Sequence, residues 1–280
     1  MTTDMARATR EATEVLAGAV SRWLPLDHGG TSNRLLLGED RAGTPRWVLR
    51  VNAPPERAFG VNRLREAAVL DGIAEAPWAP RVIDNRPMTG WCLFAWHGEP
   101  AELSRTLMNA LMDAVASWQR LSDPPAFDYN ALFSAYAARL DDAMQPLLAR
   151  LHDELAALPA VPRCLCHHDL HAGNLCVGDD GALTVLDWEY AGGGIPWFDA
   201  IALHDEFGVN ASAIRGLPAF EALDAGRVDE GLGRARWCAR ALECLWWGVR
   251  EAGADRRLQV RARRLLAGVP GEQRVGRRQR

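Results

Sequence analysis

The sequence predicts an α+β protein with two lobes, a small sheet-rich lobe followed by a larger, mainly helical lobe. Short apolar runs bounded by turn residues fill the chain up to about Trp96. Longer segments with helical spacing follow Glu99, and a polar loop between short strands, Arg163 to Gly194, interrupts them. With 280 residues, of which 48% are apolar, the chain is long enough to bury a sizeable core in two lobes.

The elements of the first lobe can be predicted in order. Apolar residues at helical spacing from Ala12 to Trp23 predict an amphipathic helix that Pro25 ends. The runs LLLG and RWVLRV, separated by the turn-rich segment GEDRAGTP, predict a β-hairpin. The segment AFGVNRLREAAVLDGIAEA then predicts a helix, and PRVID and WCLFAW predict two more strands. We therefore expect a small sheet with one inserted helix.

The second lobe is predicted to be helical on both sides of its polar loop. LMNALMDAVASWQRL and ALFSAYAARLDDAM have helical spacing, and Pro146 begins a further helix. RCLC, NLCV and LTVLD read as short strands, and helices return from Pro196 to about Ala267. The expected organisation is a sheet-rich lobe at 1–96, a helical lobe at 97–268 that contains the polar loop, and a basic tail at 269–280.

Composition excludes several classes of function. The net charge of −4 argues against a nucleic-acid surface, and the absence of lysine removes Schiff-base chemistry. No apolar run predicts a membrane span, and no secretory signal is expected at the N-terminus. The six cysteines show no CxxC spacing, so we expect reduced thiols in the cytoplasm. The oligomeric state is not predictable from these features.

The polar loop carries two aspartates whose surroundings indicate phosphoryl transfer. Within HHDLHAGN, Asp169 and Asn174 follow His167 in the pattern D-L-x-x-x-N, the form of a kinase catalytic loop. In such a loop the aspartate accepts the proton of the attacking hydroxyl, and the asparagine binds a metal ion. Asp187, in LDWE, stands where a second aspartate holds magnesium. Asp169, Asn174 and Asp187 are therefore the predicted catalytic residues, with Asn174 and Asp187 as Mg²⁺ ligands.

The paired segments HHDLHAGN and LDWEYAGGG resemble those of the aminoglycoside phosphotransferase and choline kinase superfamily. Together with RVNAP and AFGVNRLREAAVL, they resemble most the thiamine kinase-like and choline kinase-like members, and the resemblance runs from about Leu26 to His204. It implies a bilobal, protein-kinase-like fold. It also implies an enzyme that uses ATP and Mg²⁺ to phosphorylate the hydroxyl group of a small molecule.

The resemblance assigns nucleotide-binding roles in the first lobe. Arg50 occupies the position of the kinase lysine that reaches the phosphates, and Glu66 is its expected partner on the helix. The alternative is that both are ordinary surface charges. The segment HGGTSN is the expected loop over the phosphates, although it also fits a plain tight turn. Its contributing residues are Gly29, Gly30, Thr31, Ser32 and Asn33.

Further roles follow from the same resemblance. Phe94 to Trp96 is the expected connection between the lobes, where backbone groups contact adenine. His167 is expected to support the catalytic loop by hydrogen bonding, and Asp199 to hold the backbone of that loop. His168 receives no role.

The acceptor is the least determined part of the prediction. Aromatic and acidic residues favour a cationic alcohol such as thiamine, choline or ethanolamine, although tryptophans at helical spacing also fit a core. An aminoglycoside or amino sugar is the alternative acceptor, and a catalytically silent pseudokinase is the alternative of another class. A zinc site and a hydrolase triad are weaker readings of the cysteines and histidines. The candidate acceptor residues are Trp188, Glu189, Asp205 and Trp246.

Overall fold

The computed structural model describes residues 3–26, 33–251 and 255–268. The chain forms two compact units, and each combines two separate stretches of sequence. The sheet unit comprises Met1–Ala114 and His171–Gly192, and the helical unit comprises Val115–Leu170 and Gly193–Arg280. This mixture of a sheet region and a helical region confirms the predicted α+β class. The lobe boundary expected after residue 96 stays a prediction.

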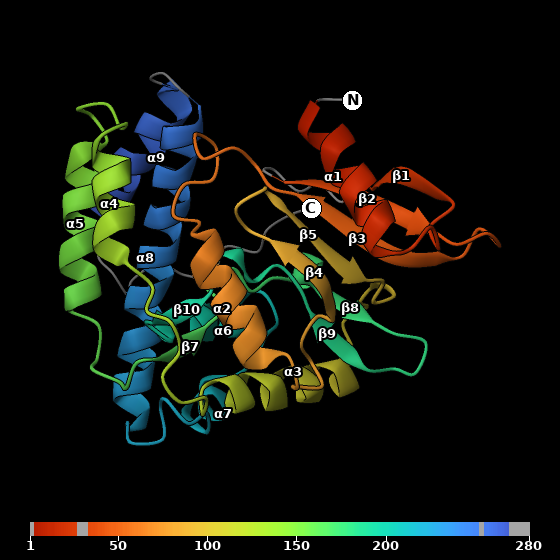
Figure 1. Cartoon of the computed structure of the whole chain (residues 1–280). Helices are drawn as coiled ribbons and strands as arrows, with labels where there is room; N and C mark the ends of the chain where they lie inside the picture. Colours follow the sequence, from red (N-terminus) through yellow and green to blue (C-terminus); the bar gives the residue numbers. More distant parts are fainter. Residues whose placement is uncertain (1–2, 27–32, 252–254, 269–280) are drawn as a thin grey trace. The chain divides into compact units, whose positions relative to one another are not determined.

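The sheet unit is built on a five-stranded antiparallel sheet with the strand order β1-β2-β3-β5-β4 (Figure 1). The predicted hairpin is its centre, because β2 pairs with β3 and β3 pairs in turn with β5. Helix α1 packs on this sheet through Ala8 and Ala12, which share a buried cluster with Leu49 and Trp91. The bounds are α1 Thr3–Val15, β1 Arg22–Leu26, β2 Arg34–Glu39, β3 Pro45–Val51, α2 Arg63–Ile73, β4 Val82–Arg86 and β5 Trp91–Ala95.

The first helix ends earlier than the sequence predicts, and the residues expected at its end form a strand. Ala17 and Gly18 have positive φ angles of 50° and 73°, which turn the chain after Val15. Trp23 therefore lies in β1, where its Nε1 donates a hydrogen bond to Oγ1 of Thr13 at 3.1 Å. Pro25 also lies in β1 instead of ending a helix. An edge strand accepts proline because one side of its backbone is unpaired.

A smaller three-stranded sheet, ordered β6-β8-β9, completes the sheet unit. Strands β8 and β9 form an antiparallel hairpin in which Leu175 pairs with Val185. This register brings the residue before β8 next to the residues after β9. The bounds are β6 Glu99–Pro100, α3 Arg105–Trp118, η1 Ala172–Asn174, β8 Leu175–Val177, β9 Leu183–Val185 and η2 Trp188–Tyr190, with the end of α3 belonging to the helical unit.

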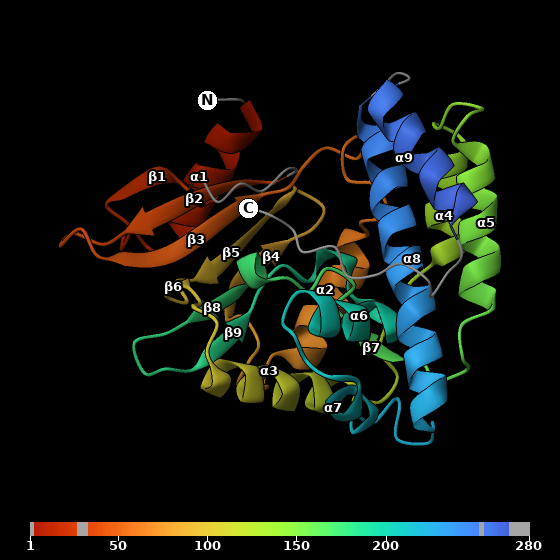
Figure 2. The ribbon, with the colours of Figure 1, turned by 180° about the vertical axis from the view of Figure 1, so that it is seen from behind.

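The helical unit is organised around the long helix α8, which contacts α5, α6, α7 and α9 (Figure 2). Its core contains Trp197 and Trp237, each at most 2% exposed. The short strand β7 pairs with β10 beside these helices. The bounds are α4 Tyr129–Ala137, α5 Gln145–Ala156, β7 Cys164–Cys166, β10 Gly192–Gly194, α6 Trp197–Asp205, α7 Ala211–Arg215, α8 Ala225–Arg250 and α9 Arg256–Ala267.

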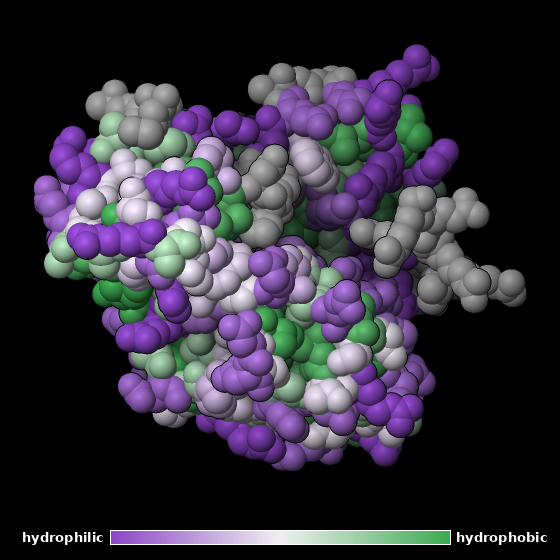
Figure 3. Space-filling model, turned by 90° about the vertical axis from the view of Figure 1, so that its right-hand side faces the viewer, coloured by the Kyte–Doolittle hydropathy of each residue, from purple (hydrophilic) through white to green (hydrophobic). Residues whose placement is uncertain are grey.

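The face of the protein shown in Figure 3 is largely hydrophilic. On this face, hydrophobic residues are visible only in separate patches between hydrophilic ones. The large exposed apolar side chains, such as Leu64 and Met88, are scattered over different elements. Across the described ranges, none of the helices combines the length and the apolar character that crossing a membrane requires.

Candidate active site

Arg50 and Glu66 form a buried ion pair within the sheet unit. Arg50 lies near the end of the central strand β3, and Glu66 lies in the first turn of α2. Their side chains are 5% and 2% exposed, and Nη1 of Arg50 is 2.6 Å from Oε1 of Glu66. The guanidinium carbon of Arg50 also lies 5.6 Å from the centre of the Phe94 ring. The structure thus brings together three residues that were expected around a nucleotide.

Both members of this pair are charged at neutral pH. Burial alone would lower the pKa of Arg50, but the attraction of Glu66 outweighs it and raises that pKa. Burial alone would raise the pKa of Glu66, yet Arg50 and then Arg63 hold it below its ordinary value. Loss of one partner from a buried pair leaves an uncompensated charge, at a cost of about 3–5 kcal/mol. The pair is therefore a strong constraint between β3 and α2.

Asp187 lies beside the pair at the end of the β8–β9 hairpin. Its backbone has φ 59° and ψ 61°, a left-handed conformation that a short polar residue tolerates better than most. Oδ1 of Asp187 is 3.7 Å from Nη1 of Arg50, and its side chain is 36% exposed. The carboxylate is thus partly open to a ligand while remaining within reach of a fixed cation.

Asn174 lies at the other end of the same hairpin. The backbone N–H of Leu186, the neighbour of Asp187, donates to the carbonyl of Asn174 at 2.8 Å. The N–H of Asn174 donates in turn to the carbonyl of His171 at 3.0 Å. The hairpin therefore joins the segments that carry Asn174 and Asp187, although 13 positions separate them in sequence (187 − 174).

Arg63 is a residue of this site that the sequence reasoning missed. Its Nη1 lies 2.9 Å from Glu66 Oε2 and 2.9 Å from Glu189 Oε2. These contacts therefore link five charged residues from β3, α2 and the segment around η2 in one row. We call it the charge ring: Asp187, Arg50, Glu66, Arg63 and Glu189. The i,i+3 spacing of Arg63 and Glu66 was the available signal, but such pairs are common on helix surfaces.

Asn33, at the end of the segment expected to cover the phosphates, contacts the charge ring. Its Nδ2 donates to Glu189 Oε2 at 2.7 Å, and its Oδ1 accepts from Arg63 Nη2 at 2.9 Å. The same oxygen accepts from the N–H of Ala53 at 3.0 Å. The other expected loop residues, Gly29, Gly30, Thr31 and Ser32, lie outside the described residues.

Asp169 lies in the helical unit, on a loop that Asp199 holds through the backbone. Oδ2 of Asp199 accepts the N–H of His167 at 2.9 Å, and Oδ1 accepts the N–H of His168 at 2.9 Å. The N–H of Asp169 then donates to Nδ1 of His167 at 3.3 Å. Burial raises the pKa of Asp199 to about 6, although the two backbone donors oppose the shift. We call Asp199 with its two backbone donors the Asp199 cradle.

The expected adenine-binding segment is partly engaged by the sheet. The N–H of Ala95 donates to the carbonyl of Arg81 at 3.0 Å, and the N–H of Trp96 donates to the carbonyl of Arg46 at 2.8 Å. These two donors are therefore already used inside the sheet unit. A base at this segment would have to use other backbone groups, or stack on half-buried side chains such as Phe94.

The four candidate acceptor residues occupy different environments. Trp188 is 1% exposed and stacks on Trp78 at 5.4 Å, so it contributes to the core. Glu189 is 5% exposed and belongs to the charge ring. In the helical unit, Asp205 accepts two hydrogen bonds from Arg236. Trp246 is half-buried, with the guanidinium carbon of Arg250 4.3 Å from its ring centre.

The cysteines are buried free thiols. Burial raises the pKa of Cys92 to about 12 and that of Cys176 to about 11, so both stay protonated at neutral pH. Over the described ranges, no group of three or more His, Cys, Asp or Glu side chains is arranged to hold a metal ion. These features give no support to a zinc site or a cysteine nucleophile.

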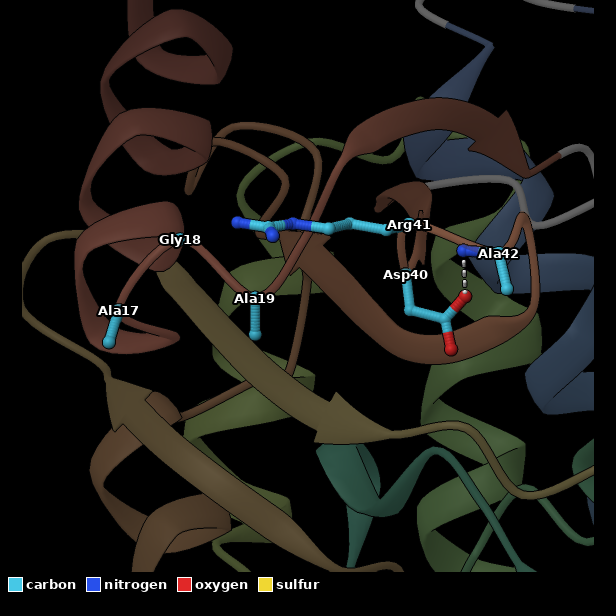
Figure 4. Close-up of a pocket in the computed structure, with 6 residues that line it drawn as sticks. All are labelled: Ala17, Gly18, Ala19, Asp40, Arg41 and Ala42. Carbon is cyan, nitrogen blue, oxygen red and sulfur yellow. Dashed lines mark hydrogen bonds between the residues drawn. The ribbon is translucent and has the colours of Figure 1, made fainter.

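A surface hollow of about 450 Å³ lies between the end of α1 and the β2–β3 turn (Figure 4). Its one carboxylate, Asp40, accepts hydrogen bonds from the N–H groups of Ala42 and Thr44 and pairs with Arg46. The hollow lies at the start of β3, whereas Arg50 lies near the end of that strand. Its polar group stabilises a turn, and the hollow contains none of the residues of the charge ring.

Comparison with known proteins places these residues in context. The model of the phosphotransferase enzyme family matches residues 23–238. No curated protein gives a significant match to the chain. A choline/ethanolamine kinase family protein from Mesorhizobium loti is 22% identical, with a TM-score of 0.65 and coverage of 95% of this chain and 94% of that one.

Two further solved structures share the fold. The choline kinase LicA from Streptococcus pneumoniae is 16% identical, with a TM-score of 0.69, and the alignment covers 95% of this chain and 99% of that one. The ADP-bound aminoglycoside phosphotransferase APH(2'')-Ib is 14% identical, with a TM-score of 0.64 and coverage of 93% and 96%. At these identities the likeness concerns the fold alone, and it confirms the predicted kinase-like architecture.

Proposed function

Because the chain belongs to the phosphotransferase enzyme family, we propose that it transfers the γ-phosphate of ATP to a hydroxyl group of a small, cationic alcohol. The observation that carries this proposal is the buried Arg50–Glu66 pair with Asp187 at 3.7 Å from the same guanidinium nitrogen. A fixed cation beside a partly exposed carboxylate suits a metal-bound polyphosphate. The family membership already makes the chain a phosphotransferase with an alcohol group as acceptor.

The residues present fit a nucleotide and its metal ion. Nη2 of Arg50 is buried and has no hydrogen-bond partner among the described residues, so its N–H groups are available to an anion. Asp187 offers carboxylate oxygens and Asn174 an amide oxygen, the hard donors that Mg²⁺ prefers. We propose that Arg50 binds phosphate and that Asn174 and Asp187 hold Mg²⁺. When bound, the ion supplies positive charge that neutralises the phosphate oxygens.

Different residues of the chain are proposed to bind the phosphates, to position other side chains and to accept the proton. Glu66 keeps Arg50 extended toward the phosphates, and Arg63 keeps Glu66 and Glu189 in place. Asp169 is proposed to orient the acceptor hydroxyl and to accept its proton late in the transfer. Asp199 and His167 fix the backbone that leads to that carboxylate, from His167 to Asp169. Gly29 to Ser32 remain the proposed phosphate cover, and Phe94 to Trp96 the proposed adenine contact.

For the acceptor we propose a thiamine-like or choline/ethanolamine-like alcohol. Two of the three solved structures named above are described as choline or choline/ethanolamine kinases. Trp246 already accepts a cation on its ring, which is the chemistry that a quaternary ammonium or thiazolium group requires. Asp205 supplies a partly exposed carboxylate, although Arg236 compensates its charge. The burial of Trp188 and the ion pair of Glu189 leave these two residues outside the proposed acceptor set.

An aminoglycoside or amino sugar is the second candidate acceptor. It is favoured by the likeness to an aminoglycoside phosphotransferase. Both candidates place an alcohol near a cationic group, so they differ in the size of the acceptor and not in the chemistry of transfer. We keep the cytoplasm as the proposed location, since six buried, unpaired thiols suit a reducing compartment.

The test is an acceptor panel read by mass spectrometry. Purified protein with Mg·ATP is offered thiamine, choline, ethanolamine and two aminoglycosides, and each product is examined for the mass of one added phosphoryl group. The expected result is a gain with one member of the cationic alcohols that disappears in Asp169→Asn. If no acceptor gains mass above that variant, the proposal of an active small-molecule kinase fails.

A further inference from the structure

His168, next to Asp169, has a backbone conformation that few residues adopt. Its φ is 65°, which lies in the left-handed region. A residue with a Cβ atom is strained there; glycine adopts this region readily, and asparagine, aspartate and histidine adopt it more often than other residues do. The conformation is held in place, because the N–H of His168 donates to Oδ1 of Asp199 at 2.9 Å. A side chain that is kept at such a position must be stabilised by its own contacts.

The contact that stabilises the imidazole is a short hydrogen bond to Tyr129. The hydroxyl of Tyr129, in the first turn of α4, lies 2.6 Å from Nε2 of His168. The same hydroxyl accepts the backbone N–H of Ile195 at 2.9 Å. Because the hydroxyl already accepts that N–H, we assign it as the donor to Nε2, an assignment that places the proton of His168 on Nδ1. Burial raises the pKa of Tyr129, which keeps this donor protonated.

Aromatic rings and a glycine surround the half-buried imidazole. The ring of Phe127 lies 4.7 Å from the imidazole, and that of Phe198 lies 6.0 Å from it. Gly194 faces both polar groups, because a Cβ atom there would come within 2.5 Å of His168 Nε2 and 2.6 Å of the Tyr129 hydroxyl. The hydrogen bond, the two aromatic contacts and the absence of a side chain at Gly194 together define a fitted pocket for the imidazole.

We propose that His168 and Tyr129 are positioning residues for Asp169, with the Tyr129–His168 hydrogen bond holding the left-handed turn that aims the carboxylate. This inference rests on the proposed function, because it gives Asp169 a role in turnover. It assigns no contact with substrate to either residue. It also explains why a histidine can occupy a position where glycine would meet no strain.

The decisive comparison is between two substitutions at the same position. His168→Gly removes the hydrogen bond but also the strain, whereas His168→Ala removes the hydrogen bond and keeps the strain. We expect kcat within about 3-fold of the parent for glycine and a loss of about 10-fold or more for alanine, the range that left-handed strain predicts. The KM for ATP should stay unchanged in both. Equal losses of kcat in the two variants would mean that the imidazole only fills space.

Tyr129→Phe tests the other half of the pair. It keeps the ring and removes the hydroxyl, so kcat should fall while the KM for ATP remains. Tyr136→Phe is the matched control, because it removes a hydroxyl from a buried tyrosine of the same helix. An unchanged kcat in Tyr129→Phe, or an equal loss in Tyr136→Phe, would overturn the assignment.

Two readouts that need no turnover separate this inference from the proposed function. Long-range proton–nitrogen NMR should show Nε2 of His168 without a proton in the parent, with the signal identified by its loss in His168→Ala. Amide hydrogen exchange at Asp169 should accelerate in His168→Ala and Tyr129→Phe, and stay near the parent rate in His168→Gly. If the parent phosphorylates no acceptor but these exchange rates follow the order stated, the proposed function fails, while the structural part of the inference stands: the Tyr129–His168 pair holds the backbone turn at Asp169. A proton on Nε2 or indifferent exchange rates would reject the inference itself.

Discussion

The charge ring of the sheet unit and the Asp199 cradle of the helical unit hold their functional residues by different forces. The ring joins side chains of opposite charge from β3, α2 and η2, with Arg50, Glu66 and Glu189 nearly fully buried. The cradle uses one buried carboxylate to accept two backbone N–H groups, so it fixes the chain itself. The first arrangement depends on charge balance, and the second depends on hydrogen-bond direction. Substitutions that preserve shape should therefore affect the two regions differently.

The largest expected effect is on the residue that the cradle presents. Asp169→Asn keeps the shape of the side chain but removes its ability to accept a proton. We expect turnover to fall by about 10²- to 10⁴-fold, the usual contribution of a general base. Nucleotide binding should stay near the parent value, because Arg50 and Asp187 are unchanged. Steady-state kinetics and equilibrium nucleotide binding measure the two quantities, and retained turnover would remove Asp169 as the base.

The ring should be most sensitive to the loss of one buried charge. Glu66→Gln leaves Arg50 and Arg63 without their shared carboxylate, so we expect the free energy of unfolding to fall by about 3–5 kcal/mol. The KM for ATP should rise as well, because Arg50 is no longer held in place. Urea denaturation gives the first quantity and kinetics the second.

The control for this variant is an exposed ion pair of the same chemistry. Glu230→Gln breaks the contacts of Glu230, whose side chain is 38% exposed, with Arg227 and Arg234, whose side chains are 51% and 31% exposed. A change of less than about 1 kcal/mol is expected there. Similar losses in Glu66→Gln and Glu230→Gln would contradict the view that burial makes the ring a constraint.

The cradle should add a pH dependence to stability. The pKa of Asp199 is raised from 3.8 to about 6 in the folded protein, so the folded state binds this proton more tightly than the unfolded state. The resulting stabilisation is complete below about pH 4 and is lost as the pH rises through about 6. A shift of this size corresponds to about 3 kcal/mol.

Asp199→Asn isolates that contribution because it cannot titrate. The free energy of unfolding of both proteins is measured from pH 7 down to pH 4. As the pH falls, the parent should become increasingly more stable than the variant. A difference that is independent of pH would show that the carboxylate titrates alike in both states.

The smallest effect on the free energy of unfolding is expected for Arg63 and Glu189, at the end of the charge ring that is distant from Asp187. Arg63→Gln and Glu189→Gln remove partners that reach Asp187 only through other residues. A double-mutant cycle should give a coupling of about 0.5–3 kcal/mol in unfolding free energy. Arg46→Gln, at an exposed pair with Asp40, is the matched arginine control. Additive effects of the two ring substitutions would show that the ring is open at this point.

Sequence reasoning could propose those residues whose chemistry leaves a local pattern. Asp169 and Asn174 lie in one short segment, HHDLHAGN, and Asp187 lies in a second, LDWE. Arg50 lies in an apolar run, and Glu66 lies on a helix that the pattern already indicated. The hairpin β2–β3 was predictable from two strands and a turn. The role of each side chain in catalysis stays a prediction.

The features that were missed depend on contacts between distant positions. Trp23 fits a helical pattern, but the turn at Ala17 and Gly18 delivers it to the sheet, where it packs against Gly38. Arg63 is significant only because Glu189, 126 positions later, meets its guanidinium. Likewise, nothing in the letters around Tyr129 points to a histidine 39 positions away. Tertiary contacts determine where these side chains lie, and such contacts cannot be predicted from the local pattern of a single sequence.

The placement of residues 171–192 in the sheet unit has a consequence for how the protein is made. The ribosome synthesises the first 114 residues well before it synthesises the β8–β9 hairpin, which completes their unit. The nascent sheet must therefore wait, without Asp187 and Glu189, while 56 residues of the other unit are synthesised (170 − 114). Arg50 and Arg63 spend that interval lacking two of their three carboxylate partners. An N-terminal fragment that ends at the predicted boundary after residue 96, or at Ala114, would remain in that same incomplete state.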